Sequence, residues 1–360
     1  MLRALVSLLV VLTFNVFAEV GQVVLNLEPN KENPRNSEGA FVTLKEGRIL
    51  FLYTQFYGGA RDESPARIAA VHSDDKGLSW SAPVIAVEND GKQNVMSVSL
   101  LRLASGKIAL LYLVKNGLHD CRPVICFSTD DAKTWSKPRH LTETPDHFVV
   151  NNDRLIQLST GRLIVPAAWH NNTGGKFNNH AIDRFFYSDD EGQTWKESAA
   201  RIDIPASIGS GLQEPGVVEL ENGTIYGWAR TSAGAQYGFL SKDQGLTWSD
   251  AAPTEMKSPL SPASIKRFDK GKLLNIYNDH SGAFEFVKGK RTPLISALST
   301  DDGKTWTNKK LLESDKDGWY CYTAIHFVED HVLLAYCAGN PKVGGLNRLR
   351  IRRVKRAELE

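Results

Sequence analysis

The sequence predicts an all-β fold, a six-bladed β-propeller, because two short patterns recur along the chain at regular intervals. The first pattern, Ser-x-Asp-x-Gly-x-x-Trp, occurs five times, in segments 73–80, 128–135, 188–195, 241–248 and 299–306. These segments start 55, 60, 53 and 58 residues apart, and a period of this length indicates structural repeats. Only the second segment departs from the pattern, with Ala132 in place of the glycine.

Each copy of the first pattern predicts a tight turn between two strands. In the first copy, Asp75 can accept hydrogen bonds from backbone N–H groups, and Gly77 tolerates a positive φ. We expect Trp80 to pack beneath the turn. The repeated residues therefore indicate a structural role.

The second pattern is a turn followed by a short apolar strand, and it occurs six times. Its segments are 45–52, 105–111, 160–165, 222–225, 270–274 and 329–334. Apolar, partly β-branched runs between turns indicate strands that are buried on both faces. Six such units fit a closed ring, which leaves no sheet edge exposed. Apolar residues also alternate along the basic segment 348–356, which predicts the strand that closes the ring.

The composition excludes several classes of protein. With 42% hydrophobic residues, 29 glycines and 8 tryptophans, the chain is typical of a soluble protein with many turns, and neither disorder nor a helical bundle is expected. The 43 basic and 41 acidic residues leave a formal charge of +2. That balance argues against a nucleic-acid partner, which a broadly basic surface would indicate.

The amino-terminal segment has the features of an export signal. Arg3 precedes an apolar run over residues 4–14, and Ala18 stands where a signal peptidase would cut. The sequence predicts a signal peptide over residues 1–18 and a single propeller domain over residues 19–360. We expect a secreted or periplasmic monomer with no membrane span in the mature chain.

The four cysteines allow two interpretations. Cys321 and Cys337 flank a turn and would face each other across a hairpin, whereas Cys121 and Cys126 would close a small loop. Both pairs are candidates for disulfides, and four buried free thiols are the alternative. Neither pair has the spacing of a metal site, and no metal or other cofactor is expected.

The five turn segments resemble the Asp-box repeats of the sialidase superfamily, and the six-unit count is similar to the sialidase propeller. The resemblance covers essentially the whole mature chain. It implies a secreted exo-glycosidase that hydrolyses terminal sialic acid, or a related acidic sugar, from glycans. Asp boxes also occur in propellers that are not enzymes, so the function has to come from the site.

The resemblance implies three arginines that hold the carboxylate of the sugar, a task that suits the planar guanidinium group. Arg230 ends the strand after Asn222-Gly223, as the second arginine of the family does, and Arg291 precedes the strand of the fifth box, like the third. Arg35, twelve residues before Gly47, is the candidate for the first, although the Ile-Pro that usually follows it in the family is missing. Arg154 is an alternative, with neighbouring Asn152 as a further substrate-binding candidate.

The resemblance also implies a tyrosine nucleophile, since a carboxylate would be repelled by an anionic sugar. Tyr322, in a segment similar to the Tyr-Ser-x-Leu of the family, is the candidate, and Tyr320 is the competing choice. Glu214, placed before Val217-Val218-Glu219-Leu220, would be its base, with Glu219 as the alternative.

A group that protonates the leaving oxygen is also required. Asp62 lies on a glycine-containing loop between two strands, where members of the family keep an aspartate, and is the candidate general acid and base. The adjacent Glu63 is the alternative.

Two further functions are also compatible with the sequence. A polysaccharide lyase acting on uronic-acid glycans would use Tyr322 or a histidine as its base, and a glycan-binding propeller would need no catalytic group. Convergence of Arg230, Arg291, Tyr322 and Glu214 at the axis of the ring would favour the hydrolase, whereas scattered positions would exclude it.

Overall fold

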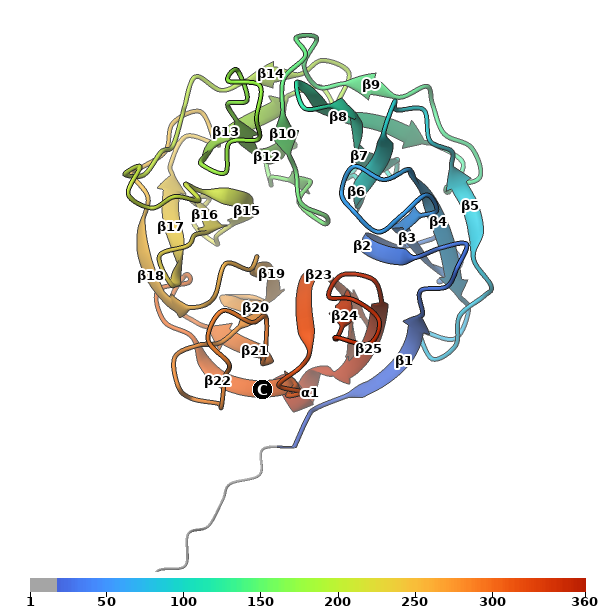
Figure 1. Cartoon of the computed structure of the whole chain (residues 1–360), viewed down its shortest axis with the longest axis vertical. Helices are drawn as coiled ribbons and strands as arrows, with labels where there is room; N and C mark the ends of the chain where they lie inside the picture. The colour runs from blue at the N-terminus through green and yellow to red at the C-terminus, as the bar shows by residue number, and fades with distance from the viewer. Residues whose placement is uncertain (1–17) are drawn as a thin grey trace, which may run out of the picture.

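The computed structural model describes residues 18–360, which form six antiparallel sheets around a central axis (Figure 1). Each sheet is one blade, and in the first five blades the first strand in the chain lies nearest the axis. Blade 1 contains β2 (Arg35–Thr43), β3 (Ile49–Phe56), β4 (Ala66–Ser73) and β5 (Val84–Val87). Blade 2 contains β6 (Asn94–Arg102), β7 (Ile108–Gly117), β8 (Asp120–Ser128) and β9 (Arg139–His140). The predicted all-β, six-bladed propeller is thereby confirmed.

The remaining blades repeat the arrangement with small variations. Blade 3 contains β10 (Phe148–Val149), β11 (Ile156–Gln157), β12 (Leu163–His170), β13 (Ala181–Ser188) and β14 (Lys196–Glu197). Blade 4 contains β15 (Gln213–Glu219), β16 (Ile225–Arg230), β17 (Ala235–Ser241) and β18 (Ala252–Lys257). Blade 5 contains β19 (Ser264–Asp269), β20 (Lys272–Asn278), β21 (Leu294–Ser299) and β22 (Thr307–Glu313).

The last blade closes the ring by joining both ends of the described chain. Its strands are β23 (Trp319–Val328), β24 (His331–Gly339), β25 (Leu349–Lys355) and β1 (Gln22–Leu27). The early strand β1 pairs with β25, so the predicted closing strand is confirmed. Helix α1 (Arg356–Leu359) follows β25 and buries Leu359. Within residues 18–360, no helix is long and apolar enough to cross a membrane.

The hydrophobic core lies between neighbouring blades. The second strands carry the apolar runs of the second repeat and are buried on both faces, as in β12 and β24. The outermost strands β5 and β18 are largely exposed. Burial on both faces explains why the inner strands lack the strict alternation of a half-exposed sheet.

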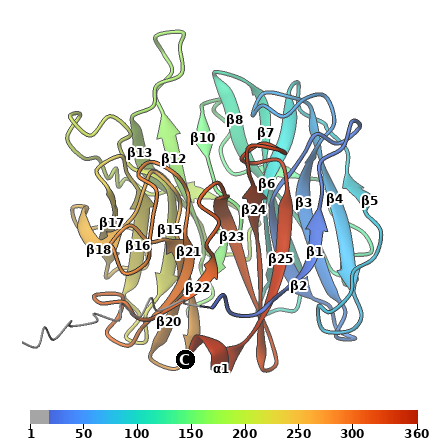
Figure 2. The same ribbon diagram turned by 60° about the horizontal axis from the view of Figure 1, so that its bottom comes forward.

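The two faces of the ring carry different features. The strands run along the axis (Figure 2), and the first and third strands of a blade point the same way. Each Asp box follows a third strand, so the boxes lie on the face opposite the one where the innermost strands begin. The predicted turn is present: Ser79 N donates to Asp75 Oδ1 at 2.8 Å, and Gly77 has φ 86° and donates to Ser73 Oγ at 2.8 Å.

Candidate active site

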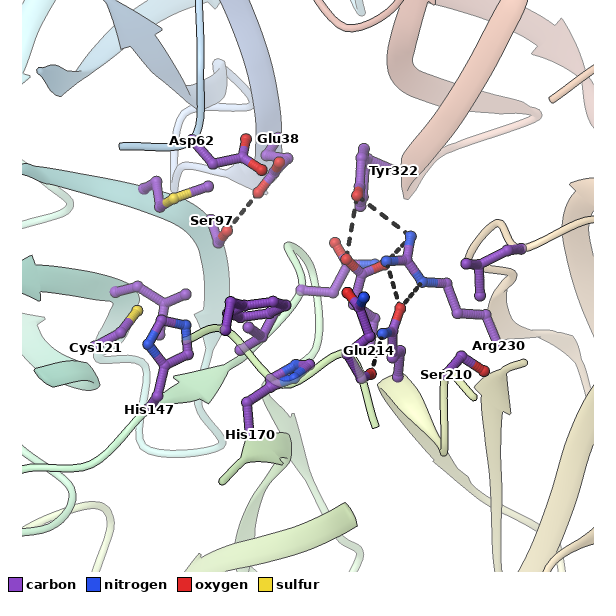
Figure 3. Close-up of a pocket in the computed structure, with 18 of the residues that line it drawn as sticks. Glu38, Asp62, Ser97, Cys121, His147, His170, Ser210, Glu214, Arg230 and Tyr322 are labelled. Carbon is purple, nitrogen blue, oxygen red and sulfur yellow. Dashed lines mark hydrogen bonds and ion pairs between the residues drawn. The ribbon is translucent and has the colours of Figure 1, made fainter. Parts of the chain in front are cut away.

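A cavity of about 630 Å³ opens at the face where the innermost strands begin. Its lining includes three carboxyl groups, one arginine and one tyrosine, namely Glu38, Asp62, Glu214, Arg230 and Tyr322. Figure 3 shows Glu38 and Asp62 on one side of the cavity and Tyr322, Glu214 and Arg230 on the other. The mouth of the ring therefore gathers groups that lie far apart in the sequence.

Tyr322 and Glu214 form the central pair of the cavity. The phenol donates a hydrogen bond to Glu214 Oε1 at 3.1 Å, and both residues are more than 90% buried. Burial raises the pKa of Tyr322, as does the charge of Glu214, and these effects outweigh the opposing charges of Arg230 and Arg291. The phenol is therefore neutral, with its proton directed at a base that can remove it.

A β-bulge directs each member of this pair into the cavity. The register of β23 shifts between Cys321 and Ala324, and Tyr322 has φ 61°. The register of β15 shifts in the same way after Gln213, and Glu214 has φ 51°. Positive φ is unfavourable for both residue types, and strain of this kind is concentrated at functional sites.

Two arginines surround the pair. Arg230 Nη1 lies 3.0 Å from Glu214 Oε2 and donates to the Tyr322 hydroxyl at 3.4 Å, while Nε and Nη2 bond to Gln213 Oε1. The guanidinium carbon of Arg291 lies 5.3 Å from the centre of the Tyr322 ring. Its Nε and Nη1 are buried without a hydrogen-bond partner among the described residues. Arg291 does not itself line the cavity, but it brings positive charge and unused donors next to the Tyr322 ring.

Arg35 is placed behind the opposite wall rather than in it. Its Nη1 donates to Asp62 Oδ1 at 2.5 Å and its Nη2 to Glu38 Oε1 at 3.3 Å, while Phe56 covers the guanidinium group. Burial favours a higher pKa for Asp62, but the charge and hydrogen bond of Arg35 outweigh it and lower the pKa. The charge of Arg35 is therefore neutralised within the protein.

Two predicted substrate-binding residues lie outside the cavity, which corrects their assignment. Asn152 is fully buried, and its amide donates to the carbonyls of Gly39 at 2.8 Å and Tyr322 at 3.1 Å. Arg154 points into the core, where it donates to the carbonyl of Ala263 at 2.7 Å. Both residues connect blades, because their side-chain N–H groups donate to backbone carbonyls of other blades.

The alternative candidates also lie elsewhere. Tyr320 packs in the hydrophobic cluster between blades 5 and 6. Glu219 stands at the far end of β15, where it accepts bonds from the N–H and hydroxyl of Ser159. Glu63 is exposed beside Arg61 and does not line the cavity. Of each pair of alternatives, Tyr322, Glu214 and Asp62 are the members that line the cavity.

All four cysteines are buried free thiols. Cys321 and Cys337 do face each other across β23 and β24, as predicted. The expected loop between Cys121 and Cys126 is wrong, because both residues lie on the extended strand β8, five positions apart and on opposite faces.

The sequence interpretation missed Glu38 and Ser97, which both line the cavity. A regular spacing marks them, since Glu38, Ser97 and Glu214 each precede the turn glycine of their blade by nine residues. His147 and Phe177 were also missed: Phe177 stands on the loop after β12 and contacts His147, with ring centres 5.5 Å apart. No comparable spacing marks these two residues.

Curated relatives of the chain are sialidases. A sialidase of Bacteroides fragilis is 28% identical over 228 residues, which make up 60% of this chain and 39% of that protein. A sialidase of Paraclostridium sordellii is 26% identical over 243 residues, which make up 60% of this chain and 57% of that protein. The chain therefore matches less than two thirds of the length of either relative.

Solved structures of the same fold match nearly the whole chain. A Hadza microbial sialidase has a TM-score of 0.72 at 19% identity, covering 90% of this chain and 66% of that one. The NanB sialidase of Streptococcus pneumoniae has a TM-score of 0.72 at 16% identity, covering 95% of this chain and 71% of that one. Residues 47–334 match the family model of the BNR repeat-like domain. The predicted membership of the Asp-box propellers is thus confirmed, and the chain belongs to the BNR repeat-like family.

Proposed function

We propose that the protein is a retaining exo-glycosidase of the sialidase type, which releases a terminal sialic acid or a related acidic sugar from glycans. The observation that carries this proposal is the hydrogen bond of 3.1 Å between Tyr322 and Glu214 inside a cavity flanked by Arg230 and Arg291. Convergence of these four residues supports the hydrolase over a propeller that only binds glycans.

The charges around the pair support an anionic sugar as the substrate. Arg230 shares its guanidinium group with Glu214 and Gln213, and Arg291 has buried donors without a partner. A carboxylate entering between them would gain charge-assisted hydrogen bonds. A neutral tyrosine can approach such a sugar without the repulsion that a carboxylate nucleophile would meet.

The chemistry follows from this arrangement. Glu214 takes the proton of Tyr322 as the phenolic oxygen attacks the anomeric carbon, and the positive charges of both arginines stabilise the phenolate that develops. The leaving oxygen receives a proton from the opposite wall, where the sequence places the role of general acid and base at Asp62. Water then attacks the anomeric carbon from the face that the leaving group has vacated, opposite the tyrosine, and the two successive inversions retain the anomeric configuration.

The test is to incubate the protein with 4-methylumbelliferyl glycosides of sialic acid and of a uronic acid. We expect Tyr322→Phe to lower turnover at least about 1000-fold, about 4 kcal/mol of transition-state stabilisation. Tyr237→Phe, on β17 and away from the cavity, is the matched control. Unchanged turnover in Tyr322→Phe would contradict the assignment. A product that absorbs ultraviolet light at an unsaturated end would indicate a lyase.

We further propose that the protein is exported and acts as a monomer. The apolar run over residues 4–14 supports export; residues 1–17 lie outside the described part of the chain. Amino-terminal sequencing of the mature protein tests the cut after Ala18, and size-exclusion chromatography tests the monomer. A mature protein that begins at Met1 would contradict export through a cleaved signal.

A further inference from the structure

Two thiols that the proposed chemistry does not use lie directly beside the reacting pair. Cys321 precedes Tyr322 in β23, and it stands opposite Cys337 in β24. Both thiols are buried in one cluster with Tyr322, against which Trp319 and Leu346 pack. A nucleophilic pair in this place can affect the site without touching the substrate.

The geometry of the two strands suits a bond between these sulfurs. Directly opposed residues of an antiparallel pair have Cα atoms about 4.5–5.5 Å apart and side chains on the same face of the sheet. A disulfide needs Cα atoms roughly 4.4–6.8 Å apart. The thiols of Cys321 and Cys337 already interact with each other. A disulfide between them therefore requires no change in the register of the strands.

The surroundings make the two thiols unequal. Burial favours a higher pKa for Cys321, but the contact with Cys337 and the charge of Arg291 outweigh burial and lower the pKa. The contact with Cys321 raises the pKa of Cys337, and burial adds to this effect. A thiol of lowered pKa beside a cation is the one that reacts as a thiolate. Cys321 is therefore the attacking sulfur of the pair, and Cys337 is the resolving one.

The contact with Arg291 joins the thiols to the site that would hold the sugar. Burial lowers the pKa of Arg291, but nearby negative groups, first Cys321 and then Tyr322, outweigh burial and raise the pKa. A thiolate at Cys321 therefore competes with a substrate carboxylate for the guanidinium group. A sulfur in a disulfide carries no charge. Oxidation of the two thiols thus leaves Arg291 to the substrate.

We propose that Cys321 and Cys337 are a modification site that controls Arg291: a disulfide oxidant joins the two cysteines, and the bond strengthens binding of the acidic sugar. The effect on binding rests on the proposed glycosidase function. Both cysteines are free thiols in this structure, which is therefore the reduced form. Cys321 and Cys337 act through Arg291 and are positioning residues.

The exchange balances in protons and electrons. Cys321 loses its proton and attacks one sulfur of the oxidant, whose sulfur–sulfur bond breaks; the other sulfur leaves with the electron pair and takes up the proton. Cys337 then gives up its proton and attacks the Cys321 sulfur, and the second oxidant sulfur leaves as a thiol. Two electrons and two protons pass to the oxidant. Since both cysteines are buried in the folded protein, the exchange takes place while the consecutive strands β23 and β24 pair during folding.

The first test measures the bond itself and needs no activity. The wild type is produced in the oxidising periplasm and in the reducing cytoplasm of a bacterial host, alkylated in urea and digested with trypsin. No lysine or arginine lies between Cys321 and Cys337, so both fall in the peptide 317–342. We expect this peptide to carry no alkyl group in the periplasmic protein and two in the cytoplasmic protein.

The other two cysteines are the control for this measurement. Cys121 and Cys126 lie five positions apart on one strand, so both should be alkylated in either preparation. A periplasmic protein with four alkylated cysteines would overturn the proposal.

The second test separates the disulfide from the thiolate by two serine variants. Cys321→Ser removes both, whereas Cys337→Ser removes the disulfide and keeps the Cys321 thiol beside Arg291. We expect the oxidised wild type to have a KM for the 4-methylumbelliferyl glycoside about 5- to 10-fold below that of the reduced wild type, with kcat little changed. Cys321→Ser should show the low KM and Cys337→Ser the high KM, each in both preparations.

The outcomes separate this proposal from the function on which it rests. Cys126→Ser, outside the cavity, should respond to oxidation as the wild type does. An equal KM in the oxidised and reduced wild type overturns the control of Arg291, even if a serine variant fails to fold. A fall in KM in Cys337→Ser overturns it as well. If neither preparation releases an acidic sugar, the proposed function fails, whereas the mass of peptide 317–342 still decides whether the disulfide forms.

Discussion

The two faces of the propeller differ in the feature that recurs from blade to blade. On the Asp-box face the same residues recur with the same bonds: Ser73 accepts from Gly77 at 2.8 Å, and Ser188 accepts from Gly192 at the same distance. On the cavity face the backbone bulge recurs, but the side chain that it presents changes from blade to blade. The bulged residues are Glu38, Ser97, Glu214 and Tyr322.

This difference indicates that the repeated turns of the Asp-box face stabilise the fold, whereas the bulged residues of the cavity face form the candidate active site. A turn that only has to close a hairpin has one favourable solution, which each blade uses again, and burial of its tryptophan contributes to the core. A catalytic site needs several different groups around one point, so a ring of equivalent positions must vary its side chains. Repeated residues therefore indicate structure, and repeated backbone geometry with divergent residues indicates the site.

Among the variants that compare the two faces, the largest effect should come from removing an arginine on the cavity face. In Arg230→Ala, Glu214 loses its ion pair and the substrate loses a charge-assisted donor. We expect kcat/KM to fall roughly 100- to 1000-fold, or about 3–4 kcal/mol, and the thermal unfolding temperature to fall as well, because Glu214 is left buried without its partner. Steady-state kinetics with the aryl glycoside measures the loss.

The matched control is an arginine on the Asp-box face. Arg48 pairs with Asp74 at 2.6 Å, and both side chains are exposed. Arg48→Ala should leave turnover unchanged, since exposed ion pairs contribute little. Equal losses of kcat/KM in Arg230→Ala and Arg48→Ala would contradict the assignment of catalysis to the cavity face alone.

A smaller effect is expected at the connection between blades 1 and 6. Asn152→Ala leaves the buried carbonyls of Gly39 and Tyr322 without their donor. We expect a loss of about 2 kcal/mol in the free energy of unfolding, and a fall in kcat rather than a rise in KM because the bulge at Tyr322 loosens. Urea unfolding and kinetics measure the two effects.

The exposed turn residue Asn222, on the Asp-box face, supplies the comparison for this variant. Asn222→Ala should change neither stability nor kcat by a comparable amount. A raised KM with unchanged stability in Asn152→Ala would instead return Asn152 to the substrate-binding role that the sequence suggested.

The ring was predictable from the sequence because its determinants are local. The Asp boxes and apolar strands are contiguous segments, and their count and period define six blades. Even the closing strand is marked by the alternation in 348–356. Side-chain direction at Asn152 and Arg154 is not local: it depends on which backbone carbonyls another blade brings near, and no pattern within 150–154 specifies that.

The site was partly predictable for the same reason. Tyr322, Glu214, Arg230 and Arg291 have distinctive neighbours in the sequence, and the structure brings all four together. Glu38 lies only three residues from Arg35, but its importance depends on a bulge and on Ser97 from the next blade. The free state of Cys121 and Cys126 was not predictable, because their spacing alone did not show that they share one strand.

The smallest effect concerns the one Asp box that breaks the pattern. Ala132 adopts φ 67° and still donates to Ser128 Oγ at 2.8 Å, as the glycines do in the other boxes. An alanine in this conformation is strained, whereas a glycine is not. Ala132→Gly should therefore raise the free energy of unfolding by about 0.5–1 kcal/mol, less than the full strain because glycine also increases the entropy of the unfolded chain. Urea unfolding measures the change.

The reverse change tests whether the five turns are energetically equivalent. In Gly192→Ala the new Cβ would lie 2.4 Å from Phe127 Cζ, so the ring must move in addition to the backbone strain. Gly192→Ala should lower the free energy of unfolding by more than Ala132→Gly raises it. Turnover should be unchanged in both variants, because both turns lie on the face opposite the cavity. Equal and opposite changes in the free energy of unfolding would mean that backbone strain alone determines the stability of the turn. A change in kcat in either variant would mean that the two faces are coupled, against the separation of stability and chemistry argued above.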